Sequence, residues 1–268
     1  MRLSAMGDVA MTVPVLRALA NQYPELKITV ISRPFFQPFF KDIPNLDFFA
    51  FDEKERHKGI KGLWRLYQDL KALHIDAFAD LHNVLRSKVV RSLFAMSGKK
   101  VAFVDKGRAE KKALTRAENK IFQPLTTMFE RHQLVFESLG FPFDLSQPQF
   151  PAKAEISQPE IAAIVAQSKN TIGIAPFAQY DSKVYPLDLM KEVIDTLAQN
   201  QKHTILLFGG GPKEKETLQT LVGDKTNVFN MAGKIPFQEE LNLISNLNVM
   251  LSMDSGNAHI AAMLGVPV

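Results

Sequence analysis

The feature that most constrains the fold is a repeated alternation of short apolar runs with longer amphipathic segments. The apolar runs are rich in β-branched residues and almost free of charge, which is typical of parallel strands buried on both faces. They comprise residues 27–31, 77–80, 101–104, 171–175, 204–208 and 249–253. The segments between them predict helices at 9–22, 63–73, 84–96, 187–199 and 237–245. This alternation predicts an α/β fold of βαβ units, with parallel sheets covered by helices on both faces.

A proline-rich stretch divides the chain. Pro142, Pro148, Pro151 and Pro159 crowd into a region with few strong helix or strand signals. We therefore predict two Rossmann-like domains, 1–150 and 151–268, that face each other across a cleft. The two ends of the sequence also predict that the chain is a fragment. The turn at 4–8 should follow a buried strand for which only residues 1–3 are available, and residues 265–268 resemble the start of another strand.

Composition excludes several classes of protein. The 268 residues include no cysteine, so disulfides, thiolate nucleophiles and Cys-ligated zinc are ruled out. A net charge of +4 is far from that of a polybasic nucleic-acid binder, so no nucleic-acid partner is expected. No apolar run approaches the ~20 residues that span a bilayer. Asp8 interrupts the N-terminus before a signal-peptide core can form. A cytoplasmic protein, in at most peripheral contact with a membrane, is expected.

The first candidate for chemistry is the turn Ser4-Ala5-Met6-Gly7-Asp8, between a predicted strand and a helix. Ligands of open α/β sheets bind at the carboxyl ends of strands, which is where this turn falls. Asp8 can act there as a general base, or it can cap the following helix. The turn lacks the G-x-G-x-x-G pattern of a nicotinamide dinucleotide site.

Two further candidates follow strands in the second half of the chain. Lys183 stands between the strand at 171–175 and the next helix, where its ammonium either reaches a bound phosphate or stays a solvated surface group. The glycine-rich turn at 209–211 allows close backbone approach to a ligand, and Glu214 can accept ribose hydroxyls. The alternative is an ordinary helix start, because a carboxylate there complements the helix dipole.

The strongest candidate is residues 252–262, where a buried strand leads into small polar residues and then a small-residue helix. Free N–H groups, a hydroxyl and the positive end of a helix meet there, which favours anion binding. His259 is expected one turn inside the helix, on the ligand side if Ser255 is. The alternative is that Asp254 and Ser255 only cap the helix. The sequence has no D-x-D, H-x-x-x-H or P-loop pattern, so neither a metal nor a cofactor is expected.

Together these motifs resemble glycosyltransferase family 9, the ADP-heptose:lipopolysaccharide heptosyltransferases, over essentially the whole chain. The motifs that carry the resemblance are residues 2–8 with 14–19, Ala175-Pro176 with Lys183-x-Tyr185-Pro186, Gly210-Gly211-Pro212, Met231-Ala232-Gly233-Lys234 and residues 253–262. Five such motifs in the right order make the resemblance specific. The sequence departs from the usual family pattern at Phe177, Gln179 and Tyr185.

The resemblance implies a GT-B fold, in which the N-terminal domain binds the acceptor and the C-terminal domain binds the nucleotide sugar. It implies that Asp8 is the catalytic base and that Lys183 contacts phosphate. It further implies donor contacts from Glu214 to ribose, from Met231 and Gly233 to adenine, and from Asp254, Ser255, Gly256 and His259 to the diphosphate.

The leading hypothesis is an inverting, metal-independent transfer of a heptose from ADP-heptose to a lipopolysaccharide inner-core acceptor. Two alternatives stay open. One is another GT-B enzyme of nucleotide sugars, such as a transferase with a different donor or an epimerase. The other is a non-catalytic protein that binds a nucleotide or a glycan.

A basic segment provides the last candidate. Residues 99–120 hold eight lysines and arginines against three acidic residues, directly around the predicted strand at 101–104. We expect Lys111, Lys112 and Arg116 to bind the acidic, lipid-anchored acceptor at the inner-membrane face, where cations near an anionic surface are favourable. The alternative is a solvated surface loop.

Overall fold

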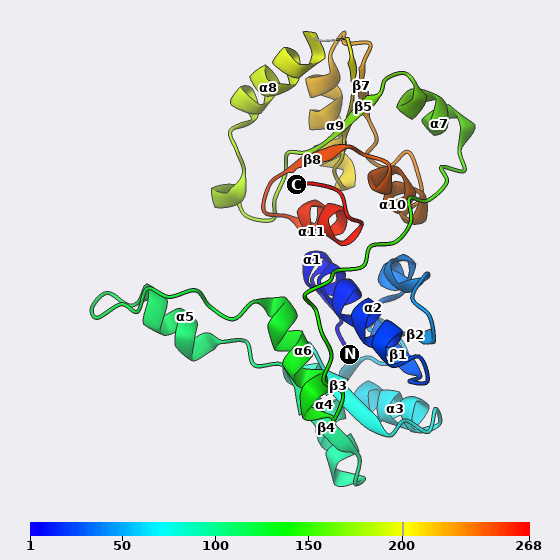
Figure 1. Ribbon diagram of the computed structural model, residues 1–268, viewed down its shortest axis with the longest axis vertical. Helices are drawn as coiled ribbons and strands as arrows, with labels where there is room; N and C mark the ends of the chain where they lie inside the picture. Colours follow the sequence, from blue (N-terminus) through cyan, green and yellow to red (C-terminus); the bar gives the residue numbers. More distant parts are fainter. Residues whose placement is uncertain (200) are drawn as a thin grey trace. The chain divides into compact units, whose positions relative to one another are not determined.

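The computed structural model describes residues 1–199 and 201–268. The chain forms two compact units, unit 1 (Met1–Gln149) and unit 2 (Phe150–Val268) (Figure 1). In both units the strands are parallel and are joined by helices, as the alternation in the sequence predicts. Among the described residues, no helix has the length and apolar character that crossing a membrane requires.

Unit 1 contains two strand pairs joined by the N-terminal segment. Its elements are α1 (Met6–Ala10), α2 (Thr12–Gln22), β1 (Ile28–Ser32), the 3-10 helix η1 (Pro34–Phe40), β2 (Leu46–Ala50), α3 (Gly59–Lys71), β3 (Ala77–Asp80), α4 (Leu85–Met96), β4 (Lys100–Phe103), α5 (Arg108–Thr115) and α6 (Met128–Ser138). β1 pairs with β2, and β3 pairs with β4. Residues 1–3 lie between the pairs, because the Arg2 N–H donates to the Ile31 carbonyl and the Leu81 N–H donates to the Met1 carbonyl, each at 3.1 Å.

The helix predicted at 9–22 is interrupted, and this corrects the sequence interpretation. α1 ends at Ala10 and α2 begins at Thr12. Pro14 has no N–H, and its ring excludes the carbonyl four residues earlier, that of Ala10. The Thr12 hydroxyl donates to the Val9 carbonyl at 2.7 Å and so satisfies a neighbouring group at the break.

Unit 2 is built on one four-stranded sheet in the order β7-β6-β5-β8. Its elements are α7 (Pro159–Ala166), β5 (Asn170–Ala175), the 3-10 helix η2 (Asp181–Lys183), α8 (Leu187–Gln199), β6 (His203–Leu207), α9 (Gly211–Val222), β7 (Val228–Asn230), α10 (Phe237–Ser245), β8 (Val249–Ser252) and α11 (Gly256–Met263). Beyond α11, the Pro267 carbonyl accepts the Met250 N–H at 2.8 Å, so the last residues lie beside β8.

The core of unit 2 explains why its strands are so apolar. Helices α8 and α9 pack side chains such as Ile194 and Leu218 against Ile205, and all three are fully buried. Gly173 in β5 leaves space for Leu247, because a Cβ there would lie 2.5 Å from the Leu247 Cδ1. Covering both faces in this way leaves the strand ends as the accessible part of the sheet.

The carboxyl ends of the parallel strands define where each unit can hold a ligand. In unit 1 this edge carries the turn at 4–8 and the loops that follow β3 and β4. In unit 2 it carries the segment at 176–186, the glycine turn after β6 and the residues between β8 and α11. Every candidate residue therefore follows a strand or residues 1–3 in the chain, and Lys111, Lys112 and Arg116 come after β4, within α5 and at its C-terminal end.

Candidate active site

Asp8 lies in the first turn of α1 and is held by a buried arginine. Arg2 Nη2 is 2.6 Å from Asp8 Oδ2, and the Ala5 N–H donates to the same oxygen at 3.3 Å. Arg2 Nη1 donates to the Leu81 carbonyl at 2.7 Å, which fixes the guanidinium. The Arg2 side chain is 8% exposed, whereas that of Asp8 is 39% exposed. The Arg2 guanidinium thus orients a solvent-accessible carboxylate. The contact of this carboxylate with the Ala5 N–H is compatible with helix capping and with a role as general base.

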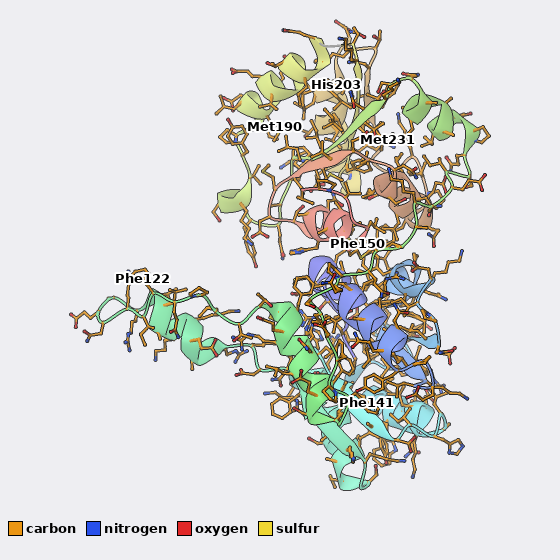
Figure 2. All side chains as sticks on the ribbon, viewed as in Figure 1. Phe122, Phe141, Phe150, Met190, His203 and Met231 are labelled. Carbon is orange, nitrogen blue, oxygen red and sulfur yellow. The ribbon has the colours of Figure 1, made fainter. Side chains whose placement is uncertain are left out.

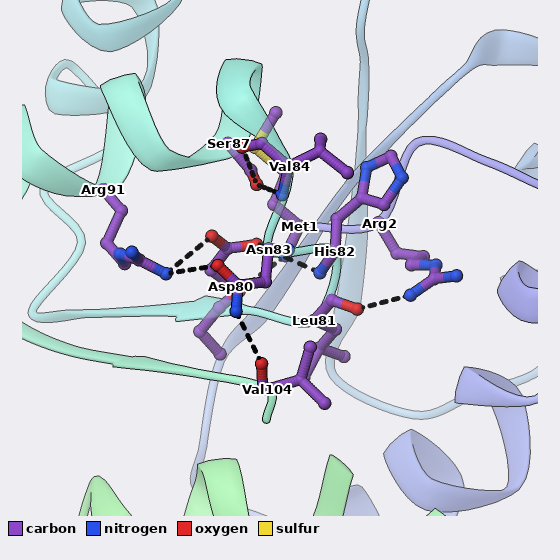
Figure 3. Close-up of polar contacts among 11 residues, drawn as sticks. Met1, Arg2, Asp80, Leu81, His82, Asn83, Val84, Ser87, Arg91 and Val104 are labelled. Atoms are coloured by element: carbon purple, nitrogen blue, oxygen red, sulfur yellow. Dashed lines mark hydrogen bonds and ion pairs between the residues drawn. The ribbon is translucent and has the colours of Figure 1, made fainter. Parts of the chain in front are cut away.

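A second carboxylate, the fully buried Asp80, organises the loop beside this pair (Figure 3). Asp80 accepts the backbone N–H groups of His82 and Asn83 at 3.0 and 2.7 Å, and Arg91 Nη1 donates to it at 3.0 Å. Asn83 Nδ2 donates to the Val104 carbonyl at 2.8 Å. These contacts tie the ends of β3 and β4 together, so the loop that accepts the Arg2 hydrogen bond is itself fixed.

Burial lowers the pKa values of the basic groups around this loop. Burial and the Arg2 charge lower the pKa of His82 to about 4, and burial also lowers the pKa of Lys106. His132 of α6 is completely buried, and neither ring nitrogen has a hydrogen-bond partner among the described residues. Burial lowers the pKa of His132 to about 4 as well. The sequence analysis did not identify Arg2 as part of this site.

In unit 2 the structure brings Lys183 and Asp254 together. Lys183 Nζ lies 2.5 Å from Asp254 Oδ2, and this hydrogen bond lowers the pKa of the Asp254 carboxyl. The two residues are far apart in sequence, but Lys183 follows β5 and Asp254 follows β8, and β5 and β8 are neighbours in the sheet. Both side chains are exposed, at 42% and 64%, so a ligand can reach either of them.

The start of α11 is left without a side-chain cap. Ser255 occupies the N-cap position in an extended conformation, but its hydroxyl makes no capping bond to the helix. The Ser255 hydroxyl instead lies 3.2 Å from that of Ser252. The Asp254 carboxylate is engaged with Lys183. The first turn of α11, which includes Gly256 and His259, therefore keeps the positive helix end and its N–H groups available to an anion.

The other predicted donor contacts lie at neighbouring strand ends with different accessibility. Glu214 Oε2 accepts the Gly210 N–H at 2.7 Å, so this carboxylate is folded onto the glycine turn. Met231, labelled in Figure 2, is buried at 1% exposure. Gly233 is exposed with a φ of +65°, and a Cβ there would meet open space. Of the three, Gly233 offers a ligand the most open surface.

The predicted acceptor-binding cations lie on a hairpin that extends away from the body of unit 1 (Figure 1). It carries α5 and Phe122, which is 81% exposed (Figure 2). α5 contains no buried residue, and Lys111 and Lys112 are exposed. Arg116 Nε donates to the Asn119 carbonyl at 2.6 Å, so this side chain also closes the hairpin turn. Within the described ranges, no cluster of three or more His, Asp or Glu side chains is arranged to hold a metal ion.

Comparison with known proteins decides the family. The family described as Glycosyltransferase family 9 (heptosyltransferase) matches residues 63–268. The chain belongs to glycosyltransferase family 9. It is therefore a glycosyltransferase, and the resemblance inferred from the motifs is confirmed.

Relatives of this family 9 chain match along nearly its whole length. The lipopolysaccharide core heptosyltransferase OpsX of Haemophilus influenzae is 26% identical over 273 residues, which cover 100% of this chain and 76% of the relative. A solved family 9 structure from Veillonella parvula superposes with a TM-score of 0.76 at 22% identity, covering 99% of this chain and 78% of that one. E. coli heptosyltransferase WaaC with ADP gives 0.71 at 19% identity, with 99% and 84% coverage. The predicted GT-B fold of two Rossmann-like domains is thereby confirmed.

Proposed function

We propose that this protein transfers a heptose from ADP-heptose to an inner-core sugar of lipopolysaccharide, with inversion at the anomeric carbon and without a metal ion. The family 9 relative named as a lipopolysaccharide core heptosyltransferase and the neighbour solved with ADP support this substrate pair. The observation that carries the proposal is the Lys183–Asp254 pair beside the uncapped start of α11, which is suited to a diphosphate.

The donor half of the mechanism is electrostatic. Negative charge develops on the ADP leaving group as the bond from its phosphate oxygen to the anomeric carbon breaks. The Lys183 ammonium and the N–H groups of Ser255 and Gly256 take up this charge, in the role that a metal ion fills in other transferases. Asp254 holds the Lys183 ammonium near the helix start before the donor arrives. Gly233 and Met231 are proposed to lie toward the adenine, and Glu214 toward the ribose.

The acceptor half of the mechanism uses Asp8. The acceptor hydroxyl oxygen attacks the anomeric carbon on the face opposite the diphosphate, a new carbon–oxygen bond forms, and ADP departs with the electrons of the broken bond. Asp8 receives the proton of the attacking hydroxyl. The buried Arg2 contact leaves the second carboxylate oxygen of Asp8 for this purpose.

Replacement of Asp8 tests the base directly. Asp8→Asn keeps the shape of the side chain but removes the proton acceptor, so turnover is expected to fall by roughly 10²–10⁴-fold. ADP binding should be nearly unchanged, because the proposed donor contacts belong to unit 2. Turnover is followed by mass spectrometry of a truncated core acceptor with ADP-heptose. Near-normal turnover in the variant would remove Asp8 from this role.

The α5 hairpin is proposed to bind the acidic part of the acceptor. Changing Lys111, Lys112 and Arg116 to Gln should weaken acceptor binding and reduce its salt sensitivity, while ADP binding stays the same. The matched control changes three exposed lysines elsewhere to Gln and so removes the same total charge. These are Lys27, Lys41 and Lys153. Equal acceptor affinity in both triple variants at low salt would show that the hairpin is only a solvated surface segment.

The place of action and the choice of nucleotide complete the proposal. An enzyme with these substrates works in the cytoplasm, in peripheral contact with the inner membrane that holds the lipid-anchored acceptor. A thermal-shift comparison of ADP, UDP, GDP and NAD tests the donor, with stabilisation expected for ADP. Selective stabilisation by UDP or GDP would favour a different nucleotide-sugar enzyme. Stabilisation by ADP without any transfer would favour a binding protein.

A further inference from the structure

The first two turns of α3 expose an apolar pair on a basic background. Ile60 is 82% exposed and Trp64 is 51% exposed, and their spacing of four residues places them on one face of the helix. Lys58, Lys61 and Arg65 are exposed around them, and none forms an ion pair within the part of the chain that the structure describes. These five residues are called the α3 patch below.

The positive charges of the α3 patch do not stabilise helix α3. A helix N-terminus is stabilised by acidic side chains, yet the first turn of α3 contains none and includes Lys61. Lys58 occupies the N-cap position and provides no side-chain cap. Gly59 and Gly62 are poor helix formers in the same turn. Capping and the helix dipole therefore do not account for the exposed cations at the start of α3, whereas an anionic partner does.

The N-terminal end of α3 is instead held in place by the loop that precedes it, through contacts of Arg56 and His57. The His57 ring is buried and stacked on Phe51, with its Nε2 3.1 Å from Asp69 Oδ2. Arg56 donates two hydrogen bonds to the Asp69 carboxylate, at 2.7 and 2.6 Å, which lower the pKa of Asp69 to about 2. Gly62 packs against the His57 backbone so closely that a Cβ would lie 2.2 Å from the His57 carbonyl carbon. The α3 patch is thus presented on a rigid base.

We propose that the α3 patch docks unit 1 onto an anionic lipid bilayer. Trp64 and Ile60 would lie at the boundary of headgroups and acyl chains, and the three cations would lie against anionic headgroups. A glycan or a free phosphate explains the cations but leaves Ile60 and Trp64 in water. A bilayer surface accounts for both, because it offers negative charge above an apolar layer. The inference rests on the proposed function only in taking the acceptor to be lipid-anchored.

The chain provides its own probe, because Trp64 is the single tryptophan of the sequence. Vesicles of phosphatidylcholine with phosphatidylglycerol should shift Trp64 emission to shorter wavelength in the full chain, and pure phosphatidylcholine vesicles should not. Changing Lys58, Lys61 and Arg65 to Gln should weaken vesicle binding on the order of 100-fold. Ile60→Ser should weaken it roughly tenfold.

The matched control is Leu73→Ser, which removes another exposed apolar side chain just beyond the C-terminal end of α3. Its vesicle affinity should stay within about twofold of the unchanged chain, since helix N- and C-terminal ends are separated along the axis. Absence of a spectral shift with phosphatidylglycerol vesicles, or an equal loss in the Leu73 and Ile60 variants, would overturn the proposal. A shift that follows protein concentration without vesicles would overturn it in favour of contact between two copies of the chain.

Transfer assays separate this inference from the proposed function. The triple Gln variant of the α3 patch should keep its turnover on a delipidated, soluble acceptor and lose rate only when the acceptor is embedded in anionic vesicles. Equal loss on both acceptors would overturn bilayer docking and assign the cations to the glycan. Vesicle binding that persists in a chain without heptose transfer would instead overturn the proposed function and leave the docking surface standing.

Discussion

Arg2 controls how the Asp8 carboxylate is presented. Its guanidinium is buried and joins Asp8 to the Leu81 carbonyl, so it is a positioning residue under the proposed function. Arg2→Met should lower kcat by roughly 10–100-fold, because a misplaced reacting group costs about this much. The KM for ADP-heptose should not change, and Arg2→Lys should restore part of the rate. An unchanged kcat, or a rise in donor KM alone, would contradict this positioning role.

The residues of the two sites differ in how far the sequence could reveal them. Lys183 and Asp254 could be assigned to one site because each follows a strand of the second half. Their ion pair depends on β5 and β8 being neighbours, and strand order is not contained in a local pattern. Arg2 could not be identified, because its burial depends on a carbonyl 79 residues away. Local patterns indicate which residue types stand at strand ends, and tertiary contacts select their partners.

At the level of secondary-structure elements, Gly173 decides how closely β5 packs on the end of α10. Gly173→Ala would place a methyl group 2.5 Å from the Leu247 Cδ1, and such overpacking should cost about 1–3 kcal/mol of unfolding free energy. Urea denaturation of a double-mutant cycle with Leu247→Ala measures the coupling. The Gly173 substitution should be much less costly once Leu247 is shortened, and additive effects would show that the clash is relieved elsewhere.

The strands that the sequence missed share one property. β2 and β7 each lie at an edge of their sheet, but so do β4 and β8, whose apolar runs the sequence did predict. β2 carries the exposed residue Asp47 among its apolar residues, and β7 spans only Val228–Asn230. An exposed acidic residue in β2 and the short length of β7 remove the continuous apolar run on which prediction depends. Strands with a continuous apolar run, the outer strands β4 and β8 included, could therefore be predicted, and β2 and β7 could not.

Across the whole molecule, the two units hold titratable groups whose pKa values burial or partial burial shifts in opposite directions. In unit 1, burial lowers the pKa of His132 from 6.5 to about 4, and His82 shifts in the same direction. In unit 2, burial raises the pKa of Glu240 from 4.5 to about 7. Below pH 6.5 His132 binds a proton in the unfolded chain but not in the folded one, so unit 1 loses stability as the pH falls toward 4. Between pH 7 and 4.5 folded Glu240 binds a proton that the unfolded chain lacks, so unit 2 gains stability over that range.

Lowering the pH from 7 to 5 should therefore remove about 2 kcal/mol from unit 1 through His132 and add about 2 kcal/mol to unit 2 through Glu240. His82 adds to the loss in unit 1, and Glu240 opposes it, so the net pH dependence of the unchanged chain understates the response of each unit. Differential scanning calorimetry of two variants separates them. His132→Leu should raise the stability at pH 5 relative to pH 7, and Glu240→Gln should lower it, compared with the unchanged chain. Parallel pH profiles for all three proteins would contradict this account, because they would show that neither His132 nor Glu240 changes its protonation on unfolding.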